Sequence, residues 1–427
     1  MANYNNTKAN AAEEVAREFP LDKTLDIVEK NLEFQLSGET MYIPVWAGKP
    51  GMGKTTHAKL IAEKMNLDLY YVSMYRPTEF FEGLPIPNSI SFEDDEKRKK
   101  NLYLVWSEPE LIHEANKRAD AAVAKGKRGC LIFLDDLHIM SPDVQKCFFE
   151  LVLERALGNY KFRDNCCILG AMNTSAISGF EGLLAAINNR IQKIYVNMPF
   201  DYWYTQCGAD LNPLIASYVK VFKDSLEEEE NTHEPFATFR SWIQLSKIVD
   251  IYYEAFKANH DTSALLENVY LAACTLMSRK MAHGLQMNIS QQLQYDYEGM
   301  VNSGKYKVSA DDTISQFSFA NVIRYLRNME DAEKLVSFLL NLIDSNSNIS
   351  LYENCILSIM YEVRSFKKAL ENRNDKYSKE RYQIINYIPI QLFKRGKGKV
   401  HEILRKLTDT PMINIQSRNK SLDSKLS

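Results

Sequence analysis

The chain has 427 residues, of which 45% are hydrophobic and 25% are charged, a balance typical of packed globular proteins. This composition excludes a disordered, collagen-like or coiled-coil chain, and the length predicts two or three domain-sized units. The formal net charge of −3 excludes a broad basic surface for coating nucleic acid, so any contact with nucleic acid would be local.

The compartment is predicted from the first residues and from the cysteines. Residues 1–19 are polar and carry acids, so they do not resemble a secretory signal peptide. No apolar run approaches the length of about 18 residues that indicates a membrane span. The seven cysteines include no C-x-x-C pair, and Cys166 and Cys167 fall in an apolar run that favours buried thiols. We therefore expect a protein of the reducing cytoplasm that does not enter a membrane.

The first half of the chain alternates apolar strands with helices. The elements predicted in chain order are a helix at 21–34, a strand at 42–46, a helix at 56–65, a strand at 67–72, a helix at 108–125, a strand at 130–134, a helix that Ser141 opens and Gly158 stops, a hairpin at 160–167 that turns at 163–165, and strands at 166–171 and 191–196. Apolar strands separated by helices indicate a parallel sheet covered on both faces, which is an α/β fold.

After Pro199 the pattern becomes mostly helical. The predicted helices cover 212–226, 241–258, 264–282, 319–328, 331–343 and 355–371. The acidic run 227–230 is interpreted as a solvated loop, and residues 418–427 as a disordered tail. Domain boundaries are expected near 200–210 and near 300.

The strand at 42–46 leads directly into a phosphate-binding loop. Residues 48–55 match G-x-x-x-x-G-K-[ST], with a strand before and a helix after, as this motif requires. The glycines allow the backbone N–H groups to surround an anion, and the following helix adds its positive N-terminal end. Lys54 is expected at the β- and γ-phosphates and Thr55 at Mg²⁺. The residues predicted to bind the nucleotide are Gly48, Lys49, Pro50, Gly51, Met52, Gly53, Lys54, Thr55 and Thr56.

A second acidic element follows the strand at 130–134. Asp135 is predicted to hold the water shell of Mg²⁺, and Asp136 to orient and deprotonate the attacking water. Two acids at a strand end can also form a plain solvated turn, but the phosphate loop favours the functional interpretation. His57 and His138 lie beside these motifs without a second His or Cys at ligand spacing, which argues against a metal site made of histidines.

Further segments follow in order across 40–250: 80–85 with 105–109, the acidic strand 131–136, the helix 141–158, the strand 168–173 that ends in an Asn, the segment 183–190 that ends in an Arg, and the Thr-Phe-Arg-Ser-Trp of 238–242. In this order they resemble the AAA+ ATPases, and specifically their MoxR-like branch, the dynein-related and MoxR ATPases. The resemblance implies a P-loop NTPase αβα core with a parallel sheet, followed by an all-α lid and a helical C-terminal region.

The resemblance also implies roles for three further residues. Asn173 would polarise the attacking water, Arg190 would act on the γ-phosphate of a neighbouring subunit, and Arg240 would reach the nucleotide from the lid. This sequence departs from the family pattern in having Asp136 in place of Glu, which shortens the side chain by one C–C bond, about 1.5 Å. It also has Phe239 where Pro is usual and Ile191 where Phe is usual.

The predicted domains are a flexible N-terminus at 1–18, the nucleotide-binding core at 19–200, the lid at 201–300, and a helical region with a disordered tail at 301–427. The expected function is hydrolysis of ATP with Mg²⁺ in a homo-oligomeric ring, a hexamer by resemblance, that remodels a protein partner, which in this branch is often of the von Willebrand A type. The alternative is a DNA-linked motor or helicase loader, suggested by the Asp-Asp pair and by the basic cluster at 394–399. A third hypothesis is a nucleotide-gated scaffold that hydrolyses ATP poorly. Two candidate pore contacts are a charged hairpin tip at 93–100 and a second hairpin through Tyr160 and Phe162.

Overall fold

The computed structural model describes residues 18–39, 42–90, 101–174, 183–229, 233–305, 307–309, 312–344, 353–371, 373–396, 398 and 400–401. It divides into two compact units, Met1–Pro199 and Phe200–Ser427, each of which is described by itself. The expectations for residues 1–17, for the hairpin tip at 93–100 and for the tail at 418–427 lie outside the described residues.

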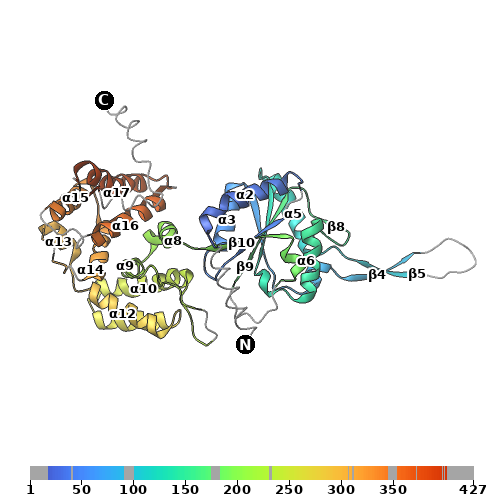
Figure 1. Ribbon diagram of the computed structural model, residues 1–427, viewed down its shortest axis with the longest axis horizontal. Helices are drawn as coiled ribbons and strands as arrows, with labels where there is room; N and C mark the ends of the chain where they lie inside the picture. The colour runs from blue at the N-terminus through green and yellow to red at the C-terminus, as the bar shows by residue number, and fades with distance from the viewer. Residues whose placement is uncertain are drawn as a thin grey trace, which may run out of the picture. The chain divides into compact units, whose positions relative to one another are not determined.

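A six-stranded parallel sheet forms the centre of the first unit (Figure 1). The strand order is β1-β10-β2-β9-β6-β3. The strands are β1 (Phe19–Pro20), β2 (Ile43–Ala47), β3 (Leu67–Ser73), β6 (Gly129–Asp135), β9 (Cys166–Met172) and β10 (Ile191–Asn197). The predicted α/β fold is therefore confirmed, and each of the five predicted strands is present within one or two residues of its expected ends. Cys166 and Cys167 are fully buried in β9, as expected.

Helices cover both faces of this sheet (Figure 1). They are α2 (Leu21–Leu36), α3 (Lys54–Lys64), α5 (Glu110–Ala124), α6 (Pro142–Glu154) and two short ones, α4 (Glu79–Glu82) and α7 (Ala185–Asn188). Helix α6 begins as predicted, with Ser141 Oγ accepting a hydrogen bond from Val144 N at 3.3 Å. It ends earlier than predicted, because Arg155 adopts the left-handed conformation at φ 51° and closes the last turn in place of Gly158.

Two antiparallel hairpins extend from the core of the first unit. The first pairs β4 (Pro85–Ile90) with β5 (Asn101–Trp106). The second pairs β7 (Ala156–Leu157) with β8 (Tyr160–Lys161), so it turns at Gly158 and Asn159 and not at 163–165 as predicted. Phe162 is 7% exposed and belongs to the apolar core, which corrects its assignment as a pore contact.

The second unit is helical, as predicted. Its α-helices are α8 (Phe200–Cys207), α9 (Pro213–Val221), α10 (Phe239–Asn259), α11 (Thr262–Cys274), α12 (Arg279–Gln292), α13 (Tyr297–Ser303), α14 (Thr313–Ser318), α15 (Met329–Asp344), α16 (Glu353–Glu371) and α17 (Lys376–Arg395), with 3₁₀ turns η3 (Gly208–Asp210) and η4 (Phe319–Tyr325). The helix predicted at 264–282 is two helices, because Ser278 caps a new one by accepting from Met281 N. Helices α8, α13, α14 and α17 were not predicted, and the helix predicted at 319–328 is the 3₁₀ turn η4.

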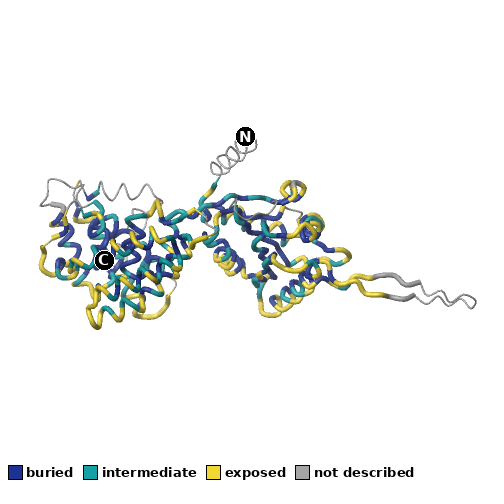
Figure 2. The backbone as a smooth tube through the Cα atoms, turned by 90° about the horizontal axis from the view of Figure 1, so that it is seen from below, coloured by how far each residue is buried: buried dark blue, intermediate teal, exposed yellow. Residues whose placement is uncertain are grey.

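Buried residues follow the strands and the inner faces of the helices in each unit (Figure 2). The core of the second unit also encloses an ion network, in which Lys220 Nζ lies 2.9 Å from Glu362 Oε1 and Arg324 lies 3.1 Å from Glu362 Oε2. Tyr204 donates a hydrogen bond to the same carboxylate. None of the helices in the described ranges combines the length and the apolar character that a bilayer span requires.

Candidate nucleotide site

The site lies where three neighbouring strands end. Strand β2 leads into the phosphate loop, β6 ends at Asp135, and β9 leads into Asn173. Since β9 pairs with both β2 and β6 in parallel, the carboxyl ends of all three meet at one edge of the sheet. This is the edge at which open α/β sheets bind their ligands.

The phosphate loop is packed closely against the sheet at its first residue. Gly48 N donates to Met172 O at 3.2 Å, and a Cβ atom at Gly48 would lie only 2.6 Å from Val196 O. Further along, Gly51 and Gly53 have φ values of 76° and 85°, which side chains rarely allow. Glycine is therefore required at these positions for close approach and for the left-handed turns.

The helix after the loop leaves its first N–H groups to a ligand. Helix α3 begins at Lys54 after Gly53, without a side-chain cap. Uncapped N–H groups at a helix start attract anions. His57 supports this turn, because burial lowers the pKa of its ring and keeps it neutral, and its Nδ1 lies 2.9 Å from Gly53 O. A carbonyl oxygen can only accept, so Nδ1 carries the proton and fixes Gly53 in place.

Lys54 is at the centre of the contacts in the site. Its ammonium group donates to Gly48 O at 2.8 Å, to Lys49 O at 2.9 Å and to Asn173 Oδ1 at 2.9 Å. The side chain is nearly buried, so this positive charge is held in place inside the loop. The first two contacts brace the loop itself, and the third joins the loop to the end of β9.

Thr55 and Asp135 fit a magnesium ion that is held partly by phosphate. Thr55 Oγ1 donates to Asp135 Oδ2 at 3.0 Å, which brings one hydroxyl and one carboxylate together at the mouth of the loop. Mg²⁺ in nucleotide sites is bound by one or two protein oxygens, phosphate oxygens and water. Across the described residues, no group of three or more His, Cys, Asp or Glu side chains could hold a metal by itself. The donor set therefore suits Mg²⁺ with a nucleotide and not a structural metal.

Asp136 stands in an unusual backbone conformation directly after Asp135. Its φ of 62° and ψ of 40° are left-handed, and its N–H donates to Asp135 Oδ1 at 3.0 Å. Non-glycine residues in this region are uncommon and collect at functional sites. The strand therefore ends at Asp135, and Asp136 lies half-buried directly after it.

His138 contacts Asn173, a contact that the sequence did not predict. From the sequence, His138 was considered only as a metal ligand, and that role was argued against. Asn173 N donates to His138 Nδ1 at 3.3 Å, and Asn173 Nδ2 lies 3.5 Å from His138 Nε2. Its place after the Asp-Asp pair was the only signal in the sequence.

The side chains of the remaining predicted loop residues make no described contact with Lys54 or Asp135. Lys49 and Thr56 are exposed, Pro50 is half-buried, and the Met52 side chain is buried. The predicted roles of Lys49, Met52 and Thr56 therefore depend on their main-chain N–H groups, which Pro50 lacks.

Arg190 makes its described contacts away from the phosphate loop. Its guanidinium stacks on Phe149 with Cζ 4.2 Å from the ring centroid, and Nη1 donates to Ala186 O at 3.2 Å. Gln145 ties this region to the acidic turn, since its Nε2 donates to Met140 O and its Oε1 accepts from Leu184 N at 2.9 Å. Arg190 is half-buried, and its guanidinium contacts no residue of the phosphate loop in the described contacts, which leaves the predicted role at a neighbouring subunit open to test.

Arg240 lies in the second unit, as the second residue of α10. It is exposed, while Phe239 and Trp242 on either side are buried. A positive charge in the first turn of a helix is unfavourable because the helix dipole is positive there. The stability of α10 therefore does not explain why an arginine stands at position 240. Phe239, the departure from the family pattern, packs its ring 4.9 Å from that of Trp203.

Within the acidic run 227–230, which was predicted to be a solvated loop, Glu228 is bonded, while Glu229 is exposed as predicted. Glu228 Oε2 accepts from Ala237 N at 2.7 Å and from Ser278 N at 3.0 Å, and Glu228 N donates to Ala237 O. Glu228 therefore fastens the residues before Arg240 to the start of α12. This contact could not be predicted from the sequence, because a glutamate in an acidic run looks the same whether it is solvated or bonded.

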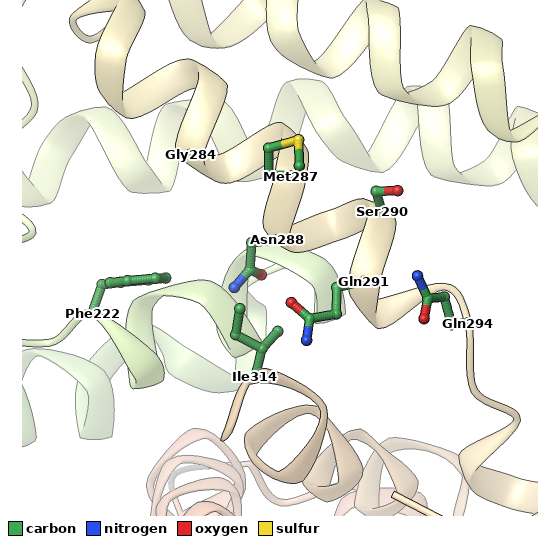
Figure 3. A pocket seen from close by; sticks show the side chains of 8 residues that line it. All are labelled: Phe222, Gly284, Met287, Asn288, Ser290, Gln291, Gln294 and Ile314. Atoms are coloured by element: carbon green, nitrogen blue, oxygen red, sulfur yellow. The ribbon is translucent and has the colours of Figure 1, made fainter. Parts of the chain in front are cut away.

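The second unit also has an open pocket of about 450 Å³, which Figure 3 shows between α12, α14 and the end of α9. It is lined by Phe222, Gly284, Met287, Asn288, Ser290, Gln291, Gln294 and Ile314. None of these carries a charge, so the pocket does not suit a triphosphate. The phosphate loop, which has the lysine and the free helix start, is the better nucleotide site.

One family model matches part of the first unit. Residues 45–197 match the family model for the ATPase family associated with various cellular activities (AAA). This segment is therefore similar to that family, of which ATPase activity is a general property, and it has the P-loop NTPase fold. A search among curated proteins found no match.

Two solved structures illustrate how distant the structural neighbours are. The Thermotoga maritima RuvB Holliday junction branch migration motor is similar with a TM-score of 0.36 and 16% identity, over 68% of this chain and 86% of that chain. A candidate ATPase from Cytophaga hutchinsonii has a TM-score of 0.27 and 14% identity, over 66% of this chain and 94% of that one. Likenesses this distant say nothing about substrate or partner.

Proposed function

We propose that this chain binds ATP with Mg²⁺ and hydrolyses it. The observation that carries the proposal is the convergence of Lys54, Thr55, Asp135 and Asn173, which come from three separate segments and lie in direct contact. A chance match to a phosphate loop would not bring the predicted magnesium ligand to Thr55 and the predicted sensor asparagine to the adjacent Lys54.

The residues divide the work of phosphoryl transfer to water. Lys54 would exchange its carbonyl partners for phosphate oxygens, and the N–H groups of the loop and of α3 would hold the phosphates. Thr55 and Asp135 would hold Mg²⁺, which supplies positive charge against the phosphate oxygens when it is bound. Asp136 would accept the proton of the attacking water, and Asn173 would orient that water.

We further propose that the active form is a homo-oligomeric ring, hexameric by resemblance, in which Arg190 acts on the nucleotide of the next subunit. The described contacts of Arg190, which are with Phe149 and Ala186 and not with the phosphate loop of its own subunit, support this. Arg190→Ala should bind ATP normally and lose turnover, whereas Lys54→Ala should lose binding. Mixing the two inactive variants should restore part of the activity, because some interfaces then pair an intact loop with an intact arginine. Mixtures that stay inactive although the subunits co-assemble would contradict the role in trans.

The proposed task is the remodelling of a protein partner in the manner of the MoxR-like branch. The β4–β5 hairpin between β3 and α5 supports it, because members of that branch carry a hairpin insertion at this place. A von Willebrand A-type protein is one partner of this kind. We also propose that the protein acts in the cytoplasm, as the cysteines led us to expect. We propose further that residues 201–300 form a lid that is distinct from the C-terminal region.

A DNA-linked motor is the second candidate, and the structure weakens one of its two supports. Arg395 of the basic cluster is paired with Glu333 and so is not a free charge for DNA. Stimulation of turnover by single- or double-stranded DNA would favour this candidate, while stimulation by a co-purifying protein and indifference to DNA would favour the first.

Steady-state phosphate release by the assembled chain tests the proposal as a whole. We expect Mg²⁺-dependent turnover that Lys54→Ala abolishes. Tight ATP binding without turnover would instead support a nucleotide-gated scaffold, and failure to bind ATP would contradict both.

A further inference from the structure

The open pocket of the second unit, shown in Figure 3, contains a buried hydrogen-bond donor. Asn288 of α12 lines this pocket and is only 2% exposed. Its Nδ2 is buried and has no hydrogen-bond partner among the residues that the structure describes. A buried donor without an acceptor is unfavourable, so a ligand that brings an acceptor to this atom gains a hydrogen bond that the empty pocket lacks.

The contacts of the neighbouring Gln292 fix the orientation of the Asn288 carboxamide. Gln292 Nε2 donates to Leu214 O at 3.1 Å and to Asn288 Oδ1 at 2.6 Å. Because a carbonyl oxygen can only accept, Gln292 must keep its nitrogen on the side of Leu214, and Asn288 must keep its oxygen toward Gln292. Asn288 Nδ2 is therefore the atom left for the pocket, and Figure 3 shows it on the side of Phe222.

Gln291, which also lines the pocket, presents an acceptor beside this donor. Its Nε2 donates to Asp312 Oδ1 at 2.6 Å, and the same carboxylate oxygen accepts from Ser315 N at 3.0 Å. A carboxylate oxygen can only accept, so Gln291 cannot exchange its nitrogen for its oxygen at this position. Its Oε1 is turned the other way, and Figure 3 shows it on the side of Asn288.

This pair of groups matches the main chain of an extended peptide. Asn288 and Gln291 are three residues apart on α12, so they are neighbours on one helical face, with Cβ atoms about 5–6 Å apart. One residue of an extended chain offers its C=O and its N–H to the same side, as paired antiparallel strands do when they exchange two hydrogen bonds. The donor of Asn288 and the acceptor of Gln291 can therefore bind both groups of a single residue.

The rest of the lining favours an uncharged segment with an apolar side chain. None of the eight lining residues carries a charge, and Phe222, Met287 and Ile314 supply apolar surface. Met287 and Gln294 are exposed, so the pocket opens to the surface of the unit, where a longer chain can enter and leave.

We propose that this pocket binds an uncharged, extended peptide segment of a partner protein through one apolar residue. The C=O of that residue accepts from Asn288 Nδ2, its N–H donates to Gln291 Oε1, and its side chain packs against Phe222 and Ile314. All of these residues lie in the second unit, so the proposal does not depend on the nucleotide site.

NMR titration of the wild-type chain with a neutral peptide tests the proposal directly. The probe is acetyl-Ala-Ala-Leu-Ala-Ala-amide, and the full chain carries nitrogen-15 in its asparagine and glutamine side chains. We expect saturable shifts of the side-chain amide signals of Asn288 and Gln291. An analogue in which an ester oxygen replaces the leucine N–H cannot donate to Gln291 Oε1, so its Kd should be about 3- to 10-fold higher.

Variants test the donor at the floor of the pocket. Asn288→Leu keeps the size of the side chain but removes Nδ2, so the Kd of the peptide should rise by about 3- to 10-fold. The matched control is His283→Ala, which removes an exposed side chain of α12 outside the pocket and should bind the peptide as the wild type does. Urea unfolding shows whether each variant folds.

Three results would overturn the proposal: a peptide that shifts neither signal in the wild type, an ester analogue that binds as tightly as the peptide, or a folded Asn288→Leu that binds it as the wild type does. Binding of the short N-acetyl-leucine N-methylamide without binding of the longer peptide would indicate a small-molecule site and would also overturn it. None of these results bears on ATP binding, which is measured separately.

Discussion

Replacing Gly48 with alanine should close the phosphate loop to nucleotide while leaving the sheet folded. The new Cβ would lie 2.6 Å from Val196 O and 2.9 Å from Val196 Cγ2, whereas ordinary contact begins at 3.4 Å. Val196 cannot yield, because it is fully buried in β10 and pairs with Phe19 of β1. The loop must therefore retreat from the sheet by about 0.8 Å to relieve the clash with the carbonyl oxygen.

The size of the effect follows from this displacement. A misplacement of about 1 Å in an active site costs on the order of 100-fold in rate. We therefore expect kcat/KM for ATP to fall by about 100-fold in Gly48→Ala, since the loop backbone itself holds the phosphates. Overpacking of this kind should also lower the free energy of unfolding by about 1–3 kcal/mol.

The matched control is Gly284→Ala in α12. A Cβ there would meet only Tyr218 Oη, at an ordinary 3.5 Å. Alanine is favoured over glycine in a helix interior by about 0.5–1 kcal/mol, so this variant should be slightly more stable and turn over ATP normally. Fluorescence titration with an ATP analogue measures the affinity for nucleotide, phosphate release measures turnover, and urea unfolding measures the free energy of unfolding. Wild-type ATP affinity and turnover in Gly48→Ala would refute the assignment of this loop as the phosphate site.

Three further changes test other parts of the molecule. Asp136→Asn removes the proton acceptor and should lower turnover by at least about 100-fold while ATP affinity by titration is retained; equal losses of both would contradict its role. Glu362→Gln leaves Lys220 and Arg324 as buried cations without their anion and should cost about 3–5 kcal/mol in urea unfolding, so an unchanged midpoint would be contrary evidence. Burial raises the pKa of Glu362, but the charges of Arg324 and Lys220 outweigh this effect and hold the pKa below its ordinary 4.5. The stability of the wild type should therefore be full above about pH 4.5 and decline below it. The Gln variant, which has no carboxyl group at this position, should not show this decline. Glu228→Ala should speed hydrogen exchange of the backbone just before α10, and protection equal to the wild type would show that Glu228 does not fasten it.

The sequence predicted which segments the structure brings together at the candidate site, because these segments are local motifs at strand ends. Each of the phosphate loop, Asp135 and Asn173 follows an apolar strand, and parallel strands bring their carboxyl ends to one edge. What the sequence could not supply was the contacts across segments. His138 meets Asn173, and Glu228 meets the start of α12, through pairings that no spacing along the chain reveals.

The wrong predictions have similar causes. Gly158 looked like a helix stop, but Arg155 adopts the left-handed conformation, while its guanidinium donates to Gln35 O at 2.8 Å from a different segment. Helix α17 was missed because Pro389 lies inside it, and an internal proline normally breaks a helix. Ile388 and Leu392, which lie on either side of Pro389 in the chain, are buried in the core of the second unit. Tertiary packing outweighs local preference in both cases.

Calorimetric titration of ATP into the full chain, with and without Mg²⁺, tests the central claim most directly. We predict one site per chain, with affinity that Lys54→Ala removes and that Asp135→Asn makes indifferent to Mg²⁺. The opposite result, in which Lys54→Ala binds ATP as the wild type does, would place the nucleotide elsewhere and contradict the account.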